Sequence, residues 1–257
     1  MKRDIYILPS IFTVTNIAAG FFSIHYSISS QFTAAAWAII VAILMDIADG
    51  RIARSLHVES SFGLELDSLA DFSSFGIAPS ILMYQLVLKD MGKIGFAIAV
   101  FFVIASALRL ARFNSKAQQN SGNMVTGSMT YFEGLPTTAA GGIIASFVLS
   151  YELFATGPEL TAKTIPLLMK RMPMFFQTMP FLMVIISIFL ISKIKYSNFK
   201  WLNFARPHSF QMLVLLIVAI ILIFTYPQNT IFIIYILYFL SGIIGYLLRL
   251  IRIRKHE

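Results

Sequence analysis

Hydrophobic residues along this chain form long runs that few polar residues interrupt. Most of these runs reach the roughly 17–25 residues that a helix needs to cross the hydrocarbon core of a bilayer. Clusters of polar residues separate them, as expected of connections at a membrane surface. The pattern therefore predicts an all-α, polytopic integral membrane protein with eight spans. These spans cover residues 5–28, 34–52, 62–88, 92–110, 129–153, 174–194, 210–226 and 231–248.

The longest polar connection comprises residues 114–128 and includes Gln118, Gln119 and Asn120. We expect an irregular surface loop here, which is either a lid over a neighbouring site or a plain linker. Pro227 and the two residues after it predict a turn between the last two spans.

Composition agrees with a membrane protein and narrows its partners. Hydrophobic residues make up 58% of the 257 positions and charged residues only 12%, against about 25% charged residues in a soluble domain. Mean hydropathy is +0.78. The net charge of +8 comes from basic residues scattered between apolar runs, so we expect no nucleic-acid partner. Because cysteine is absent, the chain forms neither disulfides nor thiolate metal sites.

The first apolar run follows Lys2 and Arg3 and is similar both to a first span and to a secretory signal peptide. Its length and its interior polar residues Thr13, Thr15 and Asn16 favour a span that lines a cavity. Asn16 has two open interpretations, a hydrogen bond between helices and a contact with substrate.

Four aspartates interrupt the apolar background within one short segment. Asp46 and Asp49 stand three residues apart at the end of the second span, while Asp67 and Asp71 stand four apart near the start of the third. Residues with these spacings lie on one face of a helix. Because a short polar connector joins the two spans, we expect both pairs to meet at the same membrane face.

Four converging carboxylates repel one another, and each costs about 2.5–3.5 kcal/mol if it reaches the bilayer centre. An all-oxygen cluster suits Mg²⁺, Mn²⁺ or Ca²⁺, and two such ions about 3.5–4 Å apart commonly serve displacement at phosphorus. The sequence therefore predicts a pair of divalent cations. Two alternatives are aspartates solvated at helix ends and a cation transporter, which would be expected to step its aspartates across the bilayer.

The acidic segment also carries a longer pattern of fixed residues, D-x-x-D-G-x-x-A-R-x8-G-x3-D-x3-D. Its members are Asp46, Asp49, Gly50, Ala53, Arg54, Gly63, Asp67 and Asp71. In this pattern the chain resembles the CDP-alcohol phosphatidyltransferases. Residues 71–79, 107–114 and 134–136 resemble the phosphatidylserine synthase branch of that family. The resemblance covers residues 5–195.

This resemblance implies a reaction and a division of the chain. Enzymes of the family join an alcohol to the phosphatidyl group of a CDP-activated lipid and release CMP, and the branch resembled here uses L-serine. Residues 1–195 would form a catalytic core of six helices, and residues 196–257 two accessory helices with a basic tail. The implied partners are CDP-diacylglycerol, L-serine and the lipid bilayer, with a homodimer as the expected assembly.

The resemblance further implies roles for single residues. All four aspartates would bind metal, and Asp71 would also act as general base toward the serine hydroxyl. The CDP-lipid would contact six residues of the pattern, namely Asp49, Gly50, Ala53, Arg54, Gly63 and Asp67.

Binding of the serine acceptor is predicted at the end of the fourth span. Arg109 and Arg112 lie three residues apart there, and a guanidinium binds a carboxylate bidentately. The alternative for both arginines is simple anchoring at the membrane surface. Ser74 is a third candidate for contact with serine.

Basic residues predict the orientation in the membrane. If the N-terminus is cytoplasmic, only Lys89, Lys93, Lys163, Lys170 and Arg171 lie outside, which leaves 15 of the 20 Lys and Arg inside. Short cytoplasmic loops are rich in Lys and Arg. We therefore expect both termini and the acidic segment on the cytoplasmic side of the cell membrane, where nucleotide-activated substrates occur.

Other acceptors and lipids stay open. A sibling transferase that uses glycerol 3-phosphate or an inositol phosphate would share the acidic pattern, but would need further basic residues for the acceptor's phosphate. In an archaeal host, ether-linked isoprenoid lipid would give archaetidylserine by the same chemistry.

Overall fold

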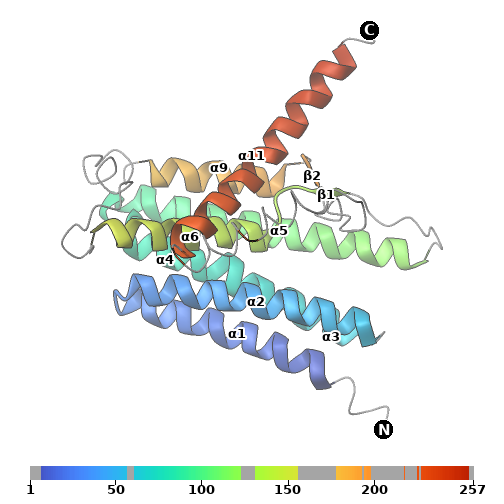
Figure 1. The fold of residues 1–257 in the computed structure, drawn as a ribbon, viewed down its shortest axis with the longest axis horizontal. Coiled ribbons are helices and arrows are strands. Elements are labelled where there is room, and N and C mark those ends of the chain that lie inside the picture. The colour runs from blue at the N-terminus through green and yellow to red at the C-terminus, as the bar shows by residue number, and fades with distance from the viewer. Residues whose placement is uncertain are drawn as a thin grey trace.

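The protein is a bundle of long helices (Figure 1). The computed structural model describes residues 7–56, 61–122, 131–155, 178–192, 194–197, 217, 225 and 227–254. The expected seventh span, 210–226, lies almost entirely outside the described residues.

The first two helices form an antiparallel hairpin. α1 runs from Ile7 to Ile28 and α2 from Phe32 to Leu56. The turn between them is tight, because the Gln31 backbone N–H donates to the Tyr26 carbonyl at 2.8 Å. The hairpin lays the N-terminal half of α1 beside the acidic end of α2.

The third stretch of helix changes type in its middle. α3 (Ser61–Asp71) continues directly into a π-helix, η2 (Phe72–Ile77), and then into α4 (Ala78–Leu86). Pro79 accounts for the change, since it has no N–H to donate and its ring would collide with the carbonyl four residues earlier in an α-helix. π-Helical turns are rare and often mark functional sites, and this one begins directly after Asp71.

The fourth helix is longer than its hydrophobic run. After a 3₁₀ turn, η3 (Leu88–Met91), α5 extends from Lys93 to Gly122. The prediction of a loop is therefore wrong for residues 114–122. Lys, Ala and Gln are good helix formers, so the polar residues end the apolar surface without ending the helix.

Two short strands, which the sequence pattern does not predict, lie on either side of the next two described helices in the chain and pair with each other. β1 (Tyr131–Glu133) pairs with β2 (Lys195–Ser197). α6 runs from Thr137 to Ala155 and α9 from Met179 to Ile191. The fifth span thus becomes helical only at Thr137, not at the expected residue 129.

Gly134 makes the turn between β1 and α6 possible. It has a φ of 80°, and a Cβ at this position would lie 2.7 Å from the Leu190 carbonyl oxygen. Its N–H donates to the Ile194 carbonyl at 2.8 Å, and the Leu135 N–H donates to the Phe189 carbonyl at 3.1 Å. The turn therefore satisfies carbonyls at and just beyond the C-terminal end of α9.

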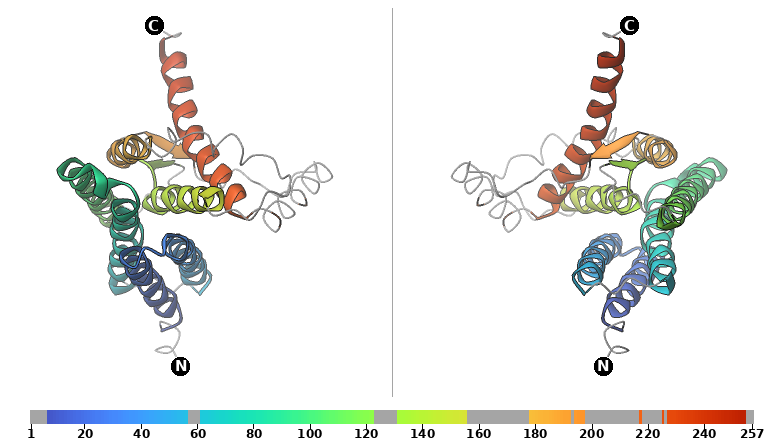
Figure 2. Two further views of the ribbon diagram at one scale, coloured as in Figure 1. Left: turned by 90° about the vertical axis from the view of Figure 1, so that its left-hand side faces the viewer. Right: turned by 90° about the vertical axis from the view of Figure 1, so that its right-hand side faces the viewer.

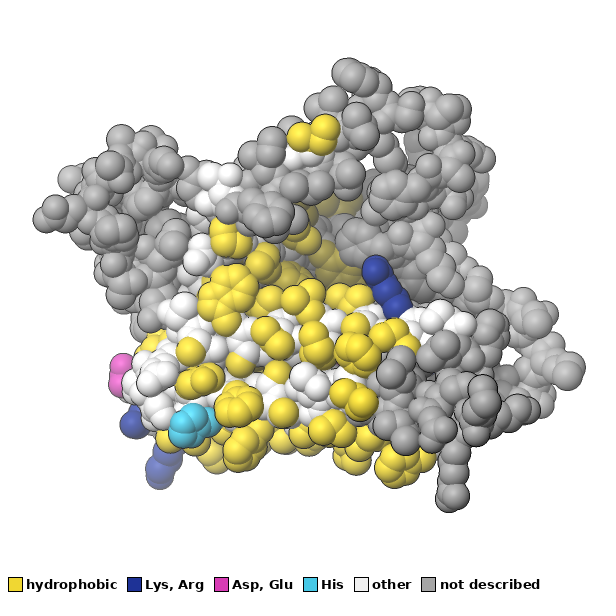
Figure 3. Space-filling model, turned by 60° about the horizontal axis from the view of Figure 1, so that its bottom comes forward, with side chains coloured by type: hydrophobic (Ala, Val, Ile, Leu, Met, Phe, Trp, Pro, Cys, Tyr) yellow, Lys and Arg dark blue, Asp and Glu magenta, His cyan; other side chains and the backbone are white. Residues whose placement is uncertain are grey.

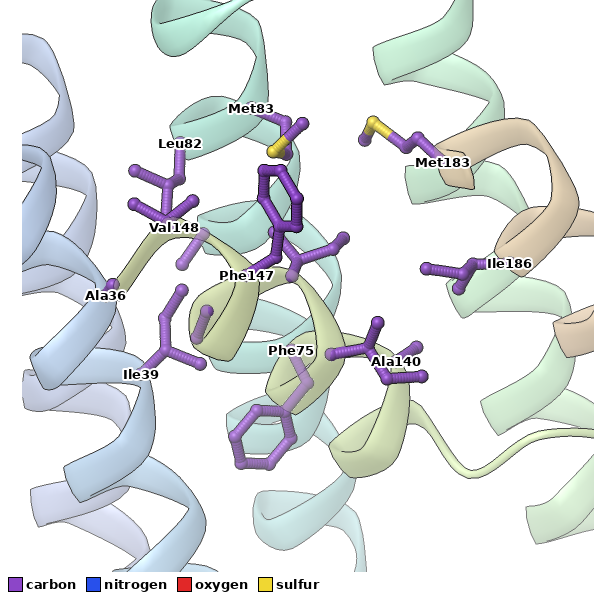
Figure 4. Close-up of a cluster of buried hydrophobic side chains, with 14 of the residues drawn as sticks. Ala36, Ile39, Phe75, Leu82, Met83, Ala140, Phe147, Val148, Met183 and Ile186 are labelled. Atoms are coloured by element: carbon purple, nitrogen blue, oxygen red, sulfur yellow. The ribbon is translucent and has the colours of Figure 1, made fainter. Parts of the chain in front are cut away.

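α6 occupies the centre of the bundle (Figure 2), and all its residues from 141 to 150 are buried. Gly141 allows a close approach, because a Cβ there would lie 3.3 Å from Cα of Phe75. Phe147 and Val148 of α6 share one buried hydrophobic cluster with Ile39 of α2 and Leu82 of α4 (Figure 4). The small residues of α6 thus serve packing.

The last described helix, α11 (Pro227–Arg254), begins where the sequence predicts a turn. Proline is common at the first position of a helix. The first half of α11 crosses α6, and its C-terminal end projects from the bundle (Figures 1 and 2).

Four described helices are long and apolar enough to cross a membrane, within Ile11–Ile28, Phe32–Ile52, Lys93–Lys116 and Pro227–Tyr246, and two shorter apolar helices accompany them. Hydrophobic side chains cover most of the described surface in Figure 3. An apolar exterior of this extent is unfavourable in water. The protein is therefore a largely helical integral membrane protein, and the count of eight spans stays a prediction.

Candidate active site

The four aspartates lie at one end of the bundle, on two neighbouring stretches of helix. α2 carries Asp46 and Asp49 in its last part, and α3 carries Asp67 and, as its final residue, Asp71. The connector at 57–60 lies outside the described residues. The predicted meeting of the two helix ends is confirmed for three of the four side chains.

Asp46, Asp67 and Asp71 form an acidic group of half-buried side chains. Each offers one carboxylate oxygen, and these oxygens lie within 4.8 Å of one another. Asp71 Oδ1 is also buried without a hydrogen-bond partner among the described residues. The group would repel itself without a cation. Its all-oxygen donors and its unpartnered buried oxygen fit a hard divalent cation.

Asp49 points toward α1 and is not one of these three. It is 7% exposed, and its Oδ2 accepts a hydrogen bond from the Thr13 hydroxyl. It nevertheless lies within electrostatic range of Asp67. Its role as a metal ligand stays a prediction.

Arg109 of α5 lies beside the acidic group. Its side chain is 8% exposed and within electrostatic range of Asp71. Its Nη1 donates to the Thr137 hydroxyl at 3.4 Å, and its Cζ lies 5.6 Å from the centre of the Phe113 ring. Its Nε is buried with no partner among the described residues. Arg109 therefore keeps one buried N–H donor available near Asp71.

Arg112, one turn further along α5, has a different environment. Its Nη2 donates to the Ile191 carbonyl, in the last turn of α9, at 2.8 Å. Together with the N–H groups of Gly134 and Leu135 it forms what we call the α9 cap. This contact explains Arg112 without a ligand, and its binding of serine stays a prediction.

The remaining predicted site residues are Ser74 and four residues of the aspartate pattern, and they differ in burial. Ser74 is fully buried, and its hydroxyl donates to the Asn16 carbonyl at 2.9 Å. Gly50 and Gly63 are half-buried on α2 and α3. The remaining two motif residues, Ala53 and Arg54, lie in α2 with side chains outside the described part of the chain.

Asn16 stands out in α1. It is fully buried, and neither polar atom of its amide has a partner among the described residues. This finding disfavours the hydrogen bond between helices as the reason for an asparagine here. Burying an unpaired amide is costly, so a contact with substrate gains support.

Two tyrosines of α11 were not identified from the sequence as site residues. Tyr235 lies within electrostatic range of Asp46, and Tyr238 within electrostatic range of Arg109. Tyrosine in an apolar helix is also typical of a membrane interface, so the sequence holds no specific signal for this placement.

The bundle, its apolar exterior and its half-buried acidic group define a membrane protein with a site suited to a divalent cation. The family model for CDP-alcohol phosphatidyltransferase matches residues 6–189. The chain therefore belongs to this family, which confirms the resemblance in the aspartate pattern.

Similar proteins occur in bacteria and in an archaeon. A Helicobacter pylori protein named CDP-diacylglycerol–serine O-phosphatidyltransferase is 32% identical over 251 residues, 98% of this chain and 95% of that protein. A Bacillus subtilis protein of the same name is 33% identical over 152 residues, 58% of this chain and 81% of its own. A Methanothermobacter thermautotrophicus protein named archaetidylserine synthase is 33% identical over 196 residues, 74% of this chain and 69% of its own.

Proposed function

We propose that this chain transfers the phosphatidyl group of CDP-diacylglycerol to the hydroxyl of L-serine and releases CMP. The convergence of Asp46, Asp67 and Asp71 in a member of this family carries the proposal. The name of the relative that aligns with 98% of the chain supports serine as the acceptor.

The proposed reaction is a displacement at phosphorus. The serine hydroxyl oxygen forms a bond to the phosphatidyl phosphorus while the bond from that phosphorus to the oxygen of CMP breaks, and the hydroxyl proton passes to a base. A divalent cation pair, Mg²⁺ or Mn²⁺ with Ca²⁺ as a further candidate, would neutralise charge on the diphosphate. Asp46, Asp49, Asp67 and Asp71 would hold these ions.

Asp71 is the proposed general base. Its carboxylate has two oxygens, so one can bind a cation while the other accepts the proton from serine, and no hydrogen bond within the described residues occupies Oδ1. If Asp71 also binds a cation, its carboxylate would be a weak base and would take the proton late, as the new bond to phosphorus forms. Such a role is typically worth about 10²–10⁴ in rate.

The motif residues would receive the CDP-lipid. The two half-buried glycines, Gly50 and Gly63, leave the acidic faces of α2 and α3 without bulk, which suits a nucleotide bound against these faces. The proposed contacts are Asp49, Gly50, Ala53, Arg54, Gly63 and Asp67.

Arg109 is the best supported of the three residues proposed to bind serine. It is buried near Asp71, and its Nε has no partner among the described residues. A guanidinium with a free N–H suits the serine carboxylate. Arg112 and Ser74 each donate to a backbone carbonyl instead, so we expect smaller contributions from them.

We propose that the site lies at the membrane surface. The acyl chains stay in hydrocarbon while the diphosphate meets water-borne serine, so the cost of extracting the lipid is avoided. We further propose that the site and both termini face the cytoplasm, that the chain forms a homodimer, and that residues 1–195 form the catalytic core.

A second candidate product is archaetidylserine, made from an ether-linked CDP-lipid. The similarity to the archaeal relative, which covers 74% of this chain, supports this candidate. The headgroup chemistry is the same in both cases, so the two candidates differ only in the lipid.

An assay of acceptor and lipid tests the proposal. Purified protein in lipid–detergent micelles receives Mn²⁺, Mg²⁺ or Ca²⁺, either CDP-diacylglycerol or its ether-linked counterpart, and labelled serine, glycerol 3-phosphate or inositol phosphate. We expect CMP release and a labelled lipid with serine alone. Turnover with a phosphorylated acceptor and none with serine would overturn the proposal, and transport of a cation without CMP release would favour the transporter.

A further inference from the structure

We propose that α11 forms one wall of the active site, with Tyr235 as a positioning residue for Asp46 and Tyr238 as a positioning residue for Arg109. The inference rests on the proposed function of the acidic group. It gives a role to a helix that lies beyond the residues matched by the family model, 6–189, and that sequence analysis treats as accessory.

Aromatic contacts fix α11 against the bundle. Phe232 meets Phe147 of α6 edge to face, with ring centres 6.0 Å apart, and Phe239 meets Phe189 of α9 at 5.0 Å. Such pairs are worth about 0.5–1.5 kcal/mol beyond the area that they bury. Phe239 is only 7% exposed, so α11 packs against two helices of the proposed core.

The same contacts determine where Tyr235 points. Residues 232, 235 and 239 follow the spacing of one helical face, so the Tyr235 ring is directed at α6. There it lies against Gly142, where a Cβ would collide with the ring and would lie 2.6 Å from the hydroxyl oxygen. Glycine at 142 thus makes room for this ring, and the ring lies within electrostatic range of Asp46.

Tyr238 lies one turn further along α11 and packs against the hydrophobic core. It is within electrostatic range of Arg109. Arg109 already contacts Thr137 of α6 and the Phe113 ring of its own helix. Tyr238 belongs to a third helix, so α5, α6 and α11 each contribute a side chain to the surroundings of the guanidinium.

The two hydroxyls suit partners of opposite charge. A phenol donates one hydrogen bond and accepts others, so Tyr235 would donate to the Asp46 carboxylate and Tyr238 would accept from the Arg109 guanidinium. Each hydroxyl would restrict the direction of a charged side chain without touching the reacting atoms.

Conservative substitutions test the two roles separately. Tyr238→Phe should raise the KM for serine about tenfold, the effect of losing one hydrogen bond to a charged group, while the KM for CDP-diacylglycerol stays unchanged. Tyr235→Phe should weaken Mn²⁺ binding about tenfold by calorimetry, as is typical when a partner of a metal ligand is removed. Tyr246→Phe is the matched control, since this tyrosine of the same helix is 43% exposed.

A substitution on α6 provides an independent test of Tyr235. Gly142→Ala should push the ring aside and weaken Mn²⁺ binding as Tyr235→Phe does, although position 142 carries no polar group. Gly245→Ala is the control, because a Cβ at this glycine of α11 would meet no atom within 4 Å.

A cross-link tests the placement of α11 without reference to catalysis. The Ser150 hydroxyl donates to the Gln228 carbonyl at 3.4 Å, and the chain has no native cysteine. Ser150→Cys combined with Gln228→Cys should therefore accept a short thiol cross-linker, and each single variant is a control. If the cross-link forms but the wild type transfers nothing to serine, the proposed function is wrong, while the placement of α11 beside α6 is still supported.

Two results would overturn the proposal that α11 forms a wall of the active site. One is absence of the cross-link in protein that is folded and active. The other is a formed cross-link together with wild-type serine KM in Tyr238→Phe and wild-type Mn²⁺ affinity in Tyr235→Phe, because α11 would then contribute packing alone.

Discussion

The acidic group and the α9 cap are two polar regions of the same apolar bundle, and they differ in whether their buried polar atoms have hydrogen-bond partners. At the cap, Arg112, Gly134 and Leu135 each donate to a carbonyl at the end of α9 or just beyond it, at 2.8–3.1 Å. Beside the acidic group, Asp71 Oδ1 and Arg109 Nε are buried with no partner among the described residues. The α9 cap closes these hydrogen bonds within the chain, and the region of the acidic group leaves these two buried polar atoms without a partner in the described part of the chain.

This difference indicates that the α9 cap contributes mainly to stability and the acidic group mainly to function. A buried polar group with a partner contributes about 0.5–1.5 kcal/mol, whereas an unpaired one costs about 1–3 kcal/mol. A fold accepts that cost where a ligand supplies the missing partner. Substitutions at the acidic group should therefore change turnover more than folding, and substitutions at the α9 cap should do the reverse.

Loss of the metal ligands should have the largest effect. EDTA should abolish turnover and added Mg²⁺ or Mn²⁺ should restore it. Asp67→Asn should reduce turnover at least about 10³-fold, because the several kcal/mol of charge stabilisation that a metal supplies corresponds to that factor. Asp90→Asn, at an exposed acidic residue of η3, is the control in a radiometric assay. Full activity after exhaustive chelation would exclude the metal site.

Asp71→Asn should have the next largest effect. Loss of the base should reduce turnover by about 10²–10⁴, while CDP-diacylglycerol and at least one metal ion still bind. Calorimetric titration beside the turnover assay separates these outcomes, with Asp67→Asn as the variant expected to lose both. If Asp71→Asn binds CDP-diacylglycerol as poorly as Asp67→Asn, the residue is a ligand only and another group must be the base.

The arginine pair gives the sharpest test of the contrast, because Arg109 and Arg112 share one helix face and differ in their partners. Arg109→Lys removes the planar fork, so the KM for serine should rise about 10–100-fold, the worth of a hydrogen bond to a charged group. Arg112→Lys should lower the melting temperature and leave the KM for serine nearly unchanged. Steady-state kinetics and thermal unfolding in detergent measure both quantities. An unchanged KM in both variants would support simple anchoring of both arginines.

The smallest effect on catalysis is expected at Gly134. A non-glycine residue at its φ of 80° costs about 1–3 kcal/mol, and the new Cβ would also press on the Leu190 carbonyl. Gly134→Ala should therefore lower the melting temperature while the folded fraction keeps its kcat. Gly92→Ala is the control, because Gly92 also has a positive φ but no atom within 4 Å of a new Cβ. Equal melting temperatures for the two variants would show that the collision contributes nothing.

Spacing along the chain is sufficient to predict the convergence of Asp46, Asp67 and Asp71, because it depends only on helical periodicity and a short connector. It does not predict the hydrogen bond from Thr13 to Asp49, because that bond depends on how α1 packs against α2. The positions of Tyr235 and Tyr238 likewise depend on the docking of α11, which periodicity within one helix does not determine.

Other errors arise where hydrophobicity and backbone geometry diverge. α5 continues to Gly122 although its apolar run ends earlier. Polar residues with high helix propensity can extend a helix beyond the part that the membrane surrounds. The delayed start of α6 follows from the backbone of Gly134, whose hydrogen bonds reach partners distant in the sequence.

The π-helix η2 sets the rotational phase of the helix that carries Asp67 and Asp71. The Ala78 N–H bonds to the Ser73 carbonyl five residues back, so the turn holds an additional residue. In an α-helix each residue advances by about 100°. Deletion of one residue between 72 and 77 would remove the additional residue and rotate the acidic face of α3 by about that angle relative to the apolar face of α4. η2 therefore couples two parts of one continuous helix: α3 presents Asp67 and Asp71 to Asp46, and α4 packs against the hydrophobic core.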